Sequence, residues 1–163
     1  MSSTLTTADP TPATRALAGK YLVFAVGSEE YGAPVIRVRE IIKMLDITKV
    51  PQAPAHIRGV INLRGKVIPV TDVRARFALP ERPYDEHTCI VVGESAAGGT
   101  ATLMGLVVDS VSEVLNIAHA DIEETPHFGA EIRSEFLHGL AKVKGKVKLL
   151  LDLDRVCNST PRR

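Results

Sequence analysis

The sequence contains the same module twice, and this internal repeat constrains the fold more than any other feature of the chain. In the first copy the most specific positions are Gly59, Gly65, Lys66, Val67 and Asp72. Identical residues recur at the same spacing in the second copy, at Gly139, Gly145, Lys146, Val147 and Asp152. An earlier block, Gly32, Val35, Val38, Glu40, Ile41 and Ile42, is matched by Gly105, Val108, Val111, Glu113, Val114 and Leu115. We therefore expect two similar lobes.

Short runs of Val, Ile and Leu bounded by turn residues predict an all-β fold with brief helices. Two copies of about 70 residues each are marginal alone, so the lobes are expected to share an interface. Strands are expected over 21–26, 57–63, 66–71, 89–92, 102–108, 137–143 and 146–151, with a further extended segment over 31–42 interrupted at 32–34.

Turn and cap residues repeat with the strands. Gly65 and Gly145 are expected in the hairpin turns, because glycine adopts positive φ without steric cost. For the same reason Gly65→Val is expected to destabilise its hairpin. Asp72 and Asp152 are expected to cap short helices, since a carboxylate accepts hydrogen bonds from the first turn.

Composition separates the folded region from its ends. Residues 1–19 are rich in Ser, Thr, Ala and Pro and are expected to form a flexible tail, with a short tail over 158–163. The domain spans 20–157, with lobes at approximately 20–85 and 86–157. No apolar run is long enough to span a bilayer and the start lacks a signal-peptide pattern, so a cytoplasmic protein with inert, buried Cys89 and Cys157 is expected.

The titratable residues do not form a catalytic or metal-binding pattern. The five histidines have no ligand spacing, and no nucleophile motif is present, so we expect no enzyme, no metal and no cofactor. A net charge of +1 gives no general reason to bind nucleic acid or an anionic membrane. The alternating stripe Lys142, Lys144, Lys146 and Lys148 is expected to keep a hairpin edge soluble, with anion binding as the alternative.

Three ordered blocks resemble the CheW-like domain family, which includes chemotaxis coupling proteins and the regulatory domain of the histidine kinase CheA. The most specific block is GVINLRGKVIPVTDVR, residues 59–74. The other two are residues 30–40, with EYG at their start, and GLVVDSVSEV at 105–114. The similarity runs from about Lys20 to Cys157, leaving the N-terminal tail outside it.

This resemblance implies a tandem pair of SH3-like five-stranded β-barrels, with strands exchanged between lobes and a groove at their junction. It implies a non-catalytic adaptor that couples chemoreceptors, the methyl-accepting chemotaxis proteins, to CheA at membrane receptor arrays. The positions that match the family's receptor-binding residues are Val38, Glu40, Gly59, Arg64 and Val114. The resemblance does not identify the kinase-binding residues.

Several alternatives stay open. Val38 and Val114 also suit the core of a barrel, and Gly59 suits a close approach of two strands better than a contact with a partner. The same scaffold would serve a non-flagellar pathway that controls pili or biofilm. The lysine stripe alone favours a nucleic-acid-binding tandem barrel.

Overall fold

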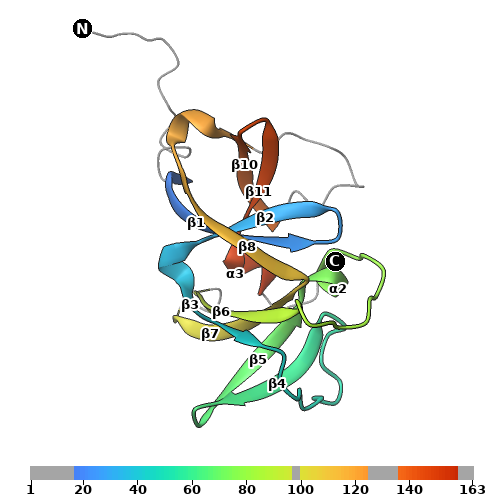
Figure 1. Cartoon of the computed structure of the whole chain (residues 1–163). Helices are drawn as coiled ribbons and strands as arrows, with labels where there is room; N and C mark the ends of the chain where they lie inside the picture. The colour runs from blue at the N-terminus through green and yellow to red at the C-terminus, as the bar shows by residue number, and fades with distance from the viewer. Residues whose placement is uncertain (1–16, 97–99, 125–135, 158–163) are drawn as a thin grey trace, which may run out of the picture.

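The computed structural model describes residues 17–96, 100–124 and 136–157, which form two β-sheets packed against each other (Figure 1). Most of the expected N-terminal tail and all of the expected C-terminal tail lie outside these residues. Gly19, expected in the tail, instead begins the first strand.

The first lobe is a six-stranded sheet in the order β8-β1-β2-β11-β10-β9. Its strands are β1 (Gly19–Val26), β2 (Glu29–Pro34), β8 (Ser110–Ile117), β9 (Ile122–Glu124), β10 (Leu137–Val143) and β11 (Lys146–Leu151). A short helix, α3 (Leu153–Val156), follows β11, and a 3-10 turn, η2 (His119–Asp121), precedes β9.

The second lobe is a five-stranded sheet in the order β3-β6-β7-β5-β4. Its strands are β3 (Val38–Lys43), β4 (Ile57–Leu63), β5 (Lys66–Asp72), β6 (Cys89–Ser95) and β7 (Thr102–Val108). Helix α2 (Val73–Arg76) follows β5, as α3 follows β11 in the first lobe. The strands expected at 57–63, 102–108, 137–143 and 146–151 have the expected bounds.

The two lobes do not correspond to the two copies of the repeat. β1 and β2 pair with β8 and β11 near the other end of the chain, whereas β6 and β7 pair with β3 and β5. A boundary at residue 85 therefore does not separate the sheets, and the strand exchange implied by the family resemblance is present. The chain crosses between lobes twice, through η1 (Val35–Arg37) and at Asp109, so the second lobe is one continuous insert.

The expected interruption at residues 32–34 is wrong, because β2 continues through Pro34 and the chain breaks at η1 instead. Gly32 serves close packing here, since an added Cβ would lie 3.2 Å from the Tyr21 ring and 3.3 Å from Leu150. Pro34 is tolerated because the parallel pairing with β11 ends at Gly32 and asks for no N–H from the proline.

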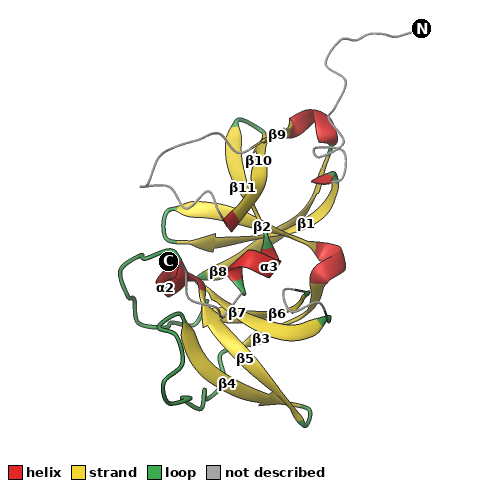
Figure 2. Cartoon of the chain, turned by 180° about the vertical axis from the view of Figure 1, so that it is seen from behind, coloured by secondary structure: helices red, strands yellow, loops and turns green. Residues whose placement is uncertain are grey.

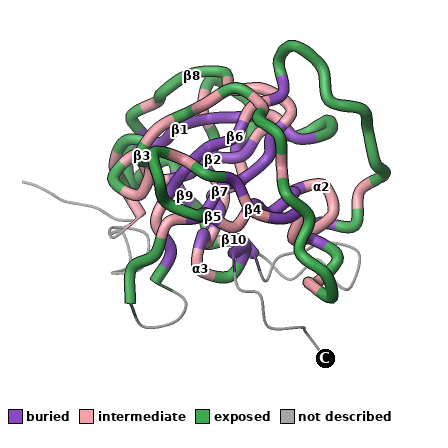
Figure 3. Tube along the Cα trace, turned by 90° about the horizontal axis from the view of Figure 1, so that it is seen from below, coloured by how far each residue is buried: buried purple, intermediate pink, exposed green. Residues whose placement is uncertain are grey.

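The largest hydrophobic core is shared by the lobes, while a smaller cluster fills each sheet. Figure 2 shows α3 between the two sheets, and Figure 3 shows the inner strands buried while β8 is mostly exposed. Aromatic rings connect the lobes: Phe77 after α2 lies 5.4 Å from Phe136 and 5.2 Å from Tyr31, measured between ring centroids. The shared core contains Leu22, Phe24, Tyr31, Val73, Phe77, Val91, Leu106, Phe136, Leu151 and Val156. The lobes thus share an interface, as expected for two marginal units.

Both hairpin turns use left-handed backbone at two successive residues. Arg64 and Gly65 have φ of 53° and 85°, and Lys144 and Gly145 have φ of 54° and 79°. Two successive residues with positive φ characterise a type I′ turn, whose twist matches that of the flanking strands.

Asp72 and Asp152 are the N-cap residues of α2 and α3. The Asp72 carboxylate accepts the N–H of Arg74 at 3.0 Å, and the Asp152 carboxylate accepts the N–H of Arg155 at 3.2 Å. Arg58 adds a hydrogen bond to Asp72 at 2.8 Å. Asp72 is 3% exposed, so this cap is also a buried ion pair.

An ion pair holds the first crossing between lobes. The Arg37 guanidinium, at the end of η1, donates to Asp154 of α3 at 2.9 Å and to the carbonyl of Glu94 at 3.2 Å. The Asp154 carboxylate also accepts the backbone N–H of Ala96 at 2.8 Å. The hydrogen bond from Arg37 lowers the pKa of Asp154 although burial opposes the shift.

A second carboxylate holds the other crossing. Asp109 accepts two hydrogen bonds from Arg74 of α2, at 3.0 and 2.8 Å, and one from Arg82 at 3.1 Å. It also accepts the backbone N–H of Gly27, in the β1–β2 turn, at 2.8 Å. Burial opposes ionisation of Asp109, but the hydrogen bonds from Arg74 and Gly27 outweigh it and keep the pKa of Asp109 below its usual range.

These carboxylates predict loss of stability in acid. Folded-state pKa values of Asp109 and Asp154 are depressed, so their stabilising effect is fully present above the unfolded value of about 4 and is lost as the pH falls towards the folded values. The melting temperature should therefore fall below about pH 4, and Asp109→Asn should make that fall shallower. Calorimetry across this range provides the test. A parental pH profile in Asp109→Asn would contradict the assignment.

Candidate functional site

The candidate site lies on β3 and β8, which occupy the same edge position in the two sheets. Ile41 on β3 is 45% exposed, and its repeat counterpart Val114 on β8 is 55% exposed. Val38 and Val111, also counterparts, are half-buried against the shared core. Each lobe thus presents one exposed apolar residue on its edge strand, and one valine of the same strand packs against the shared core.

Both edge strands carry a bulge at the equivalent place. The register of β3 shifts between Val38 and Glu40, and the register of β8 shifts opposite Val23 and Phe24 of β1. A bulge twists an edge strand and interrupts its regular row of hydrogen-bonding groups. The bulges thus keep these edges from pairing indiscriminately with other strands.

Glu40 and Arg64 come together on the second lobe. Arg64 reaches from the β4–β5 turn and forms a two-pronged ion pair with Glu40, in which Nη2 lies 3.0 Å from Oε2. Asn62 steadies the turn by accepting the Gly65 N–H at 3.0 Å. The Arg64 side chain is 74% exposed and that of Glu40 27%. The pair borders a pocket of about 510 Å³ that is also lined by Leu63, Val92 and Leu103.

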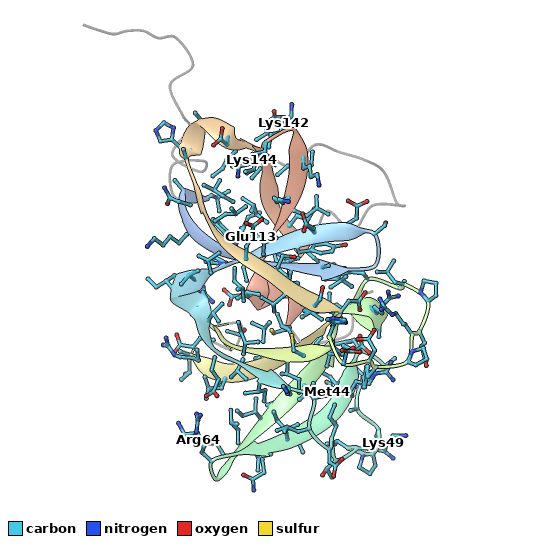
Figure 4. The ribbon with its side chains drawn as sticks, in the orientation of Figure 1. Met44, Lys49, Arg64, Glu113, Lys142 and Lys144 are labelled. Atoms are coloured by element: carbon cyan, nitrogen blue, oxygen red, sulfur yellow. The ribbon has the colours of Figure 1, made fainter. Side chains whose placement is uncertain are left out.

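The first lobe lacks an equivalent ion pair among the residues that the structure describes. The repeat counterparts of Glu40 and Arg64 are Glu113 and Lys144, both exposed. Figure 4 shows Glu113 on β8 and Lys144 at the β10–β11 turn. The Glu–Arg pair therefore distinguishes two otherwise similar lobes, although both copies carry an acidic and a basic residue at these places.

Gly59 lies beneath the surface and has no side chain to offer a partner. Its φ is 147°, and an added Cβ would lie 2.1 Å from the Thr48 carbonyl oxygen. Thr48 and Val60 exchange two backbone hydrogen bonds, at 2.9 and 2.8 Å, beside this contact. Gly59 thus serves a close approach of two backbone segments.

The expectation of a continuous lysine stripe is wrong. Lys148 is 5% exposed and pairs with Glu30, and its hydrogen bond lowers the pKa of Glu30. Lys142 pairs with Glu123 at 3.0 Å. Alternation along an antiparallel pair places Lys142 and Lys148 on opposite faces, because Lys148 faces Ala141 across the hairpin. Lys144 and Lys146 are left as the exposed cations near the turn.

No group of three or more His, Cys, Asp or Glu side chains in 17–96, 100–124 and 136–157 is arranged to hold a metal ion. His127 lies outside these ranges. Within the same ranges the structure contains no helix long and apolar enough to cross a membrane. Cys157 is buried as expected, and burial raises the pKa of its thiol to about 12. Cys89, also expected to be buried, is only half-buried, and this partial burial raises the pKa of its thiol.

A family model described as the CheW-like domain matches residues 20–160. Chemotaxis protein CheW of Klebsiella aerogenes is 34% identical over 140 residues, covering 86% of this chain and 82% of that protein. The chemotaxis protein CheW of Rhizobium meliloti is 35% identical over 142 residues, covering 86% and 88%.

A solved structure, scaffolding protein TtCheW from Thermoanaerobacter tengcongensis, superposes with a TM-score of 0.76 at 36% identity. The superposition covers 85% of this chain and 92% of the TtCheW chain. The similarity confirms the expected tandem SH3-like architecture, to which the short β9 adds a sixth strand in the first lobe. Family model, sequence relatives and fold agree, and the chain belongs to the CheW-like domain family.

Proposed function

We propose that this chemotaxis adaptor couples chemoreceptors to the regulatory domain of the histidine kinase CheA. In this role the chain carries out no chemistry; by binding both partners it makes kinase autophosphorylation responsive to receptor ligand. It works in the cytoplasm, at the receptor tip, without inserting into the membrane. The observation that carries the proposal is the family match over residues 20–160, with relatives named as chemotaxis and scaffolding proteins.

The surface of β3 and β8 supports the receptor half of the proposal. The receptor tip is a helical hairpin, and helices dock through apolar residues flanked by a few polar anchors. Ile41 and Val114 supply exposed apolar contacts, and the Glu40–Arg64 pair supplies a polar anchor. Val38 is half-buried and packs against the shared core, so it anchors the start of β3.

The direct test is autophosphorylation of CheA from labelled ATP in the presence of receptor-containing membranes, with and without this protein. We expect strong stimulation that receptor ligand suppresses. Another coupling protein, run in parallel, shows that both partners are active. Stimulation by that protein but not by this one would contradict the proposed coupling.

Arg64→Glu is expected to weaken receptor binding about tenfold, or ~1.4 kcal/mol, by placing a second carboxylate beside Glu40. Stability should change by less than about 0.5 kcal/mol, because the side chain is largely exposed. Sedimentation with receptor membranes measures binding, and a thermal melt measures stability. Lys144→Glu, at the equivalent turn of the first lobe, is the matched control and should bind receptor as the parent does. Loss of cooperative melting in Arg64→Glu would contradict the surface assignment.

A nucleic-acid-binding barrel is less well supported. That alternative rested on the lysine stripe, in which Lys148 is buried against Glu30 and Lys142 pairs with Glu123. A steep salt dependence of oligonucleotide binding would support it. In a pathway that controls pili or biofilm, the protein would couple a different receptor to a different kinase. The same kinase assay, carried out with the receptors and kinase of that pathway, tests this alternative.

A further inference from the structure

Asp109 and Asp154 each join three parts of the molecule at a crossing between lobes. Asp109 lies on the second crossing and binds Arg74 of α2 together with the N–H of Gly27. Asp154 lies on α3 and binds Arg37 of the first crossing together with the N–H of Ala96. Each contact set therefore connects a helix of one lobe, a crossing segment, and a strand end of the other lobe.

The two contact sets are equivalent in architecture and opposite in charge. Arg74 and Asp154 are the second residues of α2 and α3, so they occupy matching places in the repeat. Gly27 and Ala96 directly follow β1 and β6, which hold matching places in the two sheets. In one set the helix supplies the guanidinium and the crossing supplies the carboxylate, and in the other these roles are exchanged.

Each set holds the residue that immediately precedes an edge strand. Arg37 precedes Val38, the first residue of β3, and Asp109 precedes Ser110, the first residue of β8. Asp109 also donates its own N–H to Ala25 of β1 at 3.0 Å. These contacts connect the first residues of β3 and β8 to both lobes. The orientation of each strand relative to the lobes therefore depends on them, and with it the positions of Ile41 and Val114.

We propose that Arg37–Asp154 and Asp109–Arg74 are positioning contacts that set β3 relative to β8. For receptor recognition this rests on the proposed function, because alignment of Ile41 with Val114 matters only if the receptor binds there. The Asp109 contact is the stronger one. Its two side chains are 14% and 16% exposed, against 35% and 36% for Asp154 and Arg37, and water screens an exposed pair more effectively.

The primary test measures the distance between the edge strands by pulsed electron paramagnetic resonance. Spin labels are placed at Ile41→Cys and Val114→Cys in the full chain, and Asp109→Asn or Arg37→Met is added. Burial raises the pKa values of Cys89 and Cys157, so brief labelling at neutral pH favours the introduced cysteines. Protein without the two introduced cysteines measures background labelling.

We expect one narrow distance distribution in the parent, a broader or shifted one in Asp109→Asn, and a smaller change in Arg37→Met. Arg37→Lys, which keeps the charge, should restore most of the parental distribution. Lys142→Met removes an ion pair inside one lobe, and as the control it should leave the distance distribution unchanged. Parental distributions in both Asp109→Asn and Arg37→Met would overturn the inference, whatever the protein binds.

Receptor binding by the unlabelled variants gives the second measurement. Asp109→Asn should bind about threefold to tenfold more weakly, the effect expected when a hydrogen-bonded charge is lost. Parental binding by Asp109→Asn, with a broadened distance distribution, would overturn the role in recognition. Absence of binding by the parent would instead refute the proposed function, and the distance measurement alone would then decide the positioning role.

Discussion

Gly59→Val is expected to destabilise the protein by about 3 kcal/mol or more, one of the two largest effects that we foresee. A β-branched residue is strained at φ of 147°, and its Cβ would lie 2.1 Å from a backbone carbonyl oxygen of Thr48. Backbone cannot move aside as a flexible side chain does. The Thr48–Val60 bridge should therefore separate, and chemical denaturation should show the loss directly.

Gly65→Val is the matched control, because it introduces the same side chain at positive φ in the same hairpin. Gly65 has φ of 85°, and an added Cβ would have no atom within 4 Å. Only the backbone strain remains, so the expected cost is about 1–2 kcal/mol. Equal losses in the two variants would show that contact with Thr48 is unimportant.

This comparison also bears on receptor recognition. Gly59 is one of the positions that the family resemblance predicts to bind receptor, yet it is buried. A coupling defect in a Gly59 variant should therefore coincide with a lowered melting temperature. Arg64→Glu, by contrast, should lose coupling at an unchanged melting temperature.

Asp72→Ala is the second large effect, with an expected loss of about 3 kcal/mol. The substitution removes the cap of α2 and leaves Arg58 without the carboxylate that it binds at 2.8 Å. Asp72 is only 3% exposed, so water cannot fully replace these contacts. Because Val73 directly after it belongs to the shared core, the loss should affect both lobes.

Asp152→Ala provides the control, since Asp152 caps α3 at the matching place. Its side chain is 17% exposed, its nearest basic partners lie at 3.5 and 3.9 Å, and its expected cost is the ~1 kcal/mol of an ordinary cap. Urea titrations of both variants measure the difference. A loss in Asp152→Ala as large as that in Asp72→Ala would contradict the role assigned to Arg58.

Strand positions follow from the sequence because their signals are local. The turn pairs at Arg64–Gly65 and Lys144–Gly145 fix the hairpin ends, and alternation of apolar residues fixes the length. The break after β2 was misplaced for an equally local reason. Glycine is common in turns, but Gly32 lies within a strand, where its missing side chain leaves room for Tyr21 and Leu150.

Pairings between distant segments could not be derived from local patterns. A repeat shows that two units are alike without showing which copy of a strand joins which sheet, and here the family resemblance supplied the exchange. The burial of Lys148 could not be predicted for the same reason. Its alternation with Lys142 resembles an exposed stripe, and only the placement of Glu30 from a distant strand explains why it is buried.

The receptor-binding role of the candidate residues stays a prediction, and the structure shows where each of them lies. Glu40 and Arg64 meet as an ion pair, Val114 is exposed, Val38 packs against the shared core, and Gly59 is buried. Asp109 and Asp154 were missed. Asp109 lies on a crossing and pairs with an arginine of a helix, whereas Asp154 lies on a helix and pairs with an arginine of a crossing. A search of the two copies for identical residues therefore does not find this correspondence.

The insertion of one lobe into the other also orders the folding reaction. Residues 38–108 form their sheet among themselves, whereas β1 and β2 must pair with β8 and β11 across that whole stretch. An unfolded connection of about 70 residues makes this closure entropically costly, and a folded intervening sheet replaces it with a fixed separation between the two crossings. We therefore expect the second lobe to fold first and to bring the two ends of the chain together.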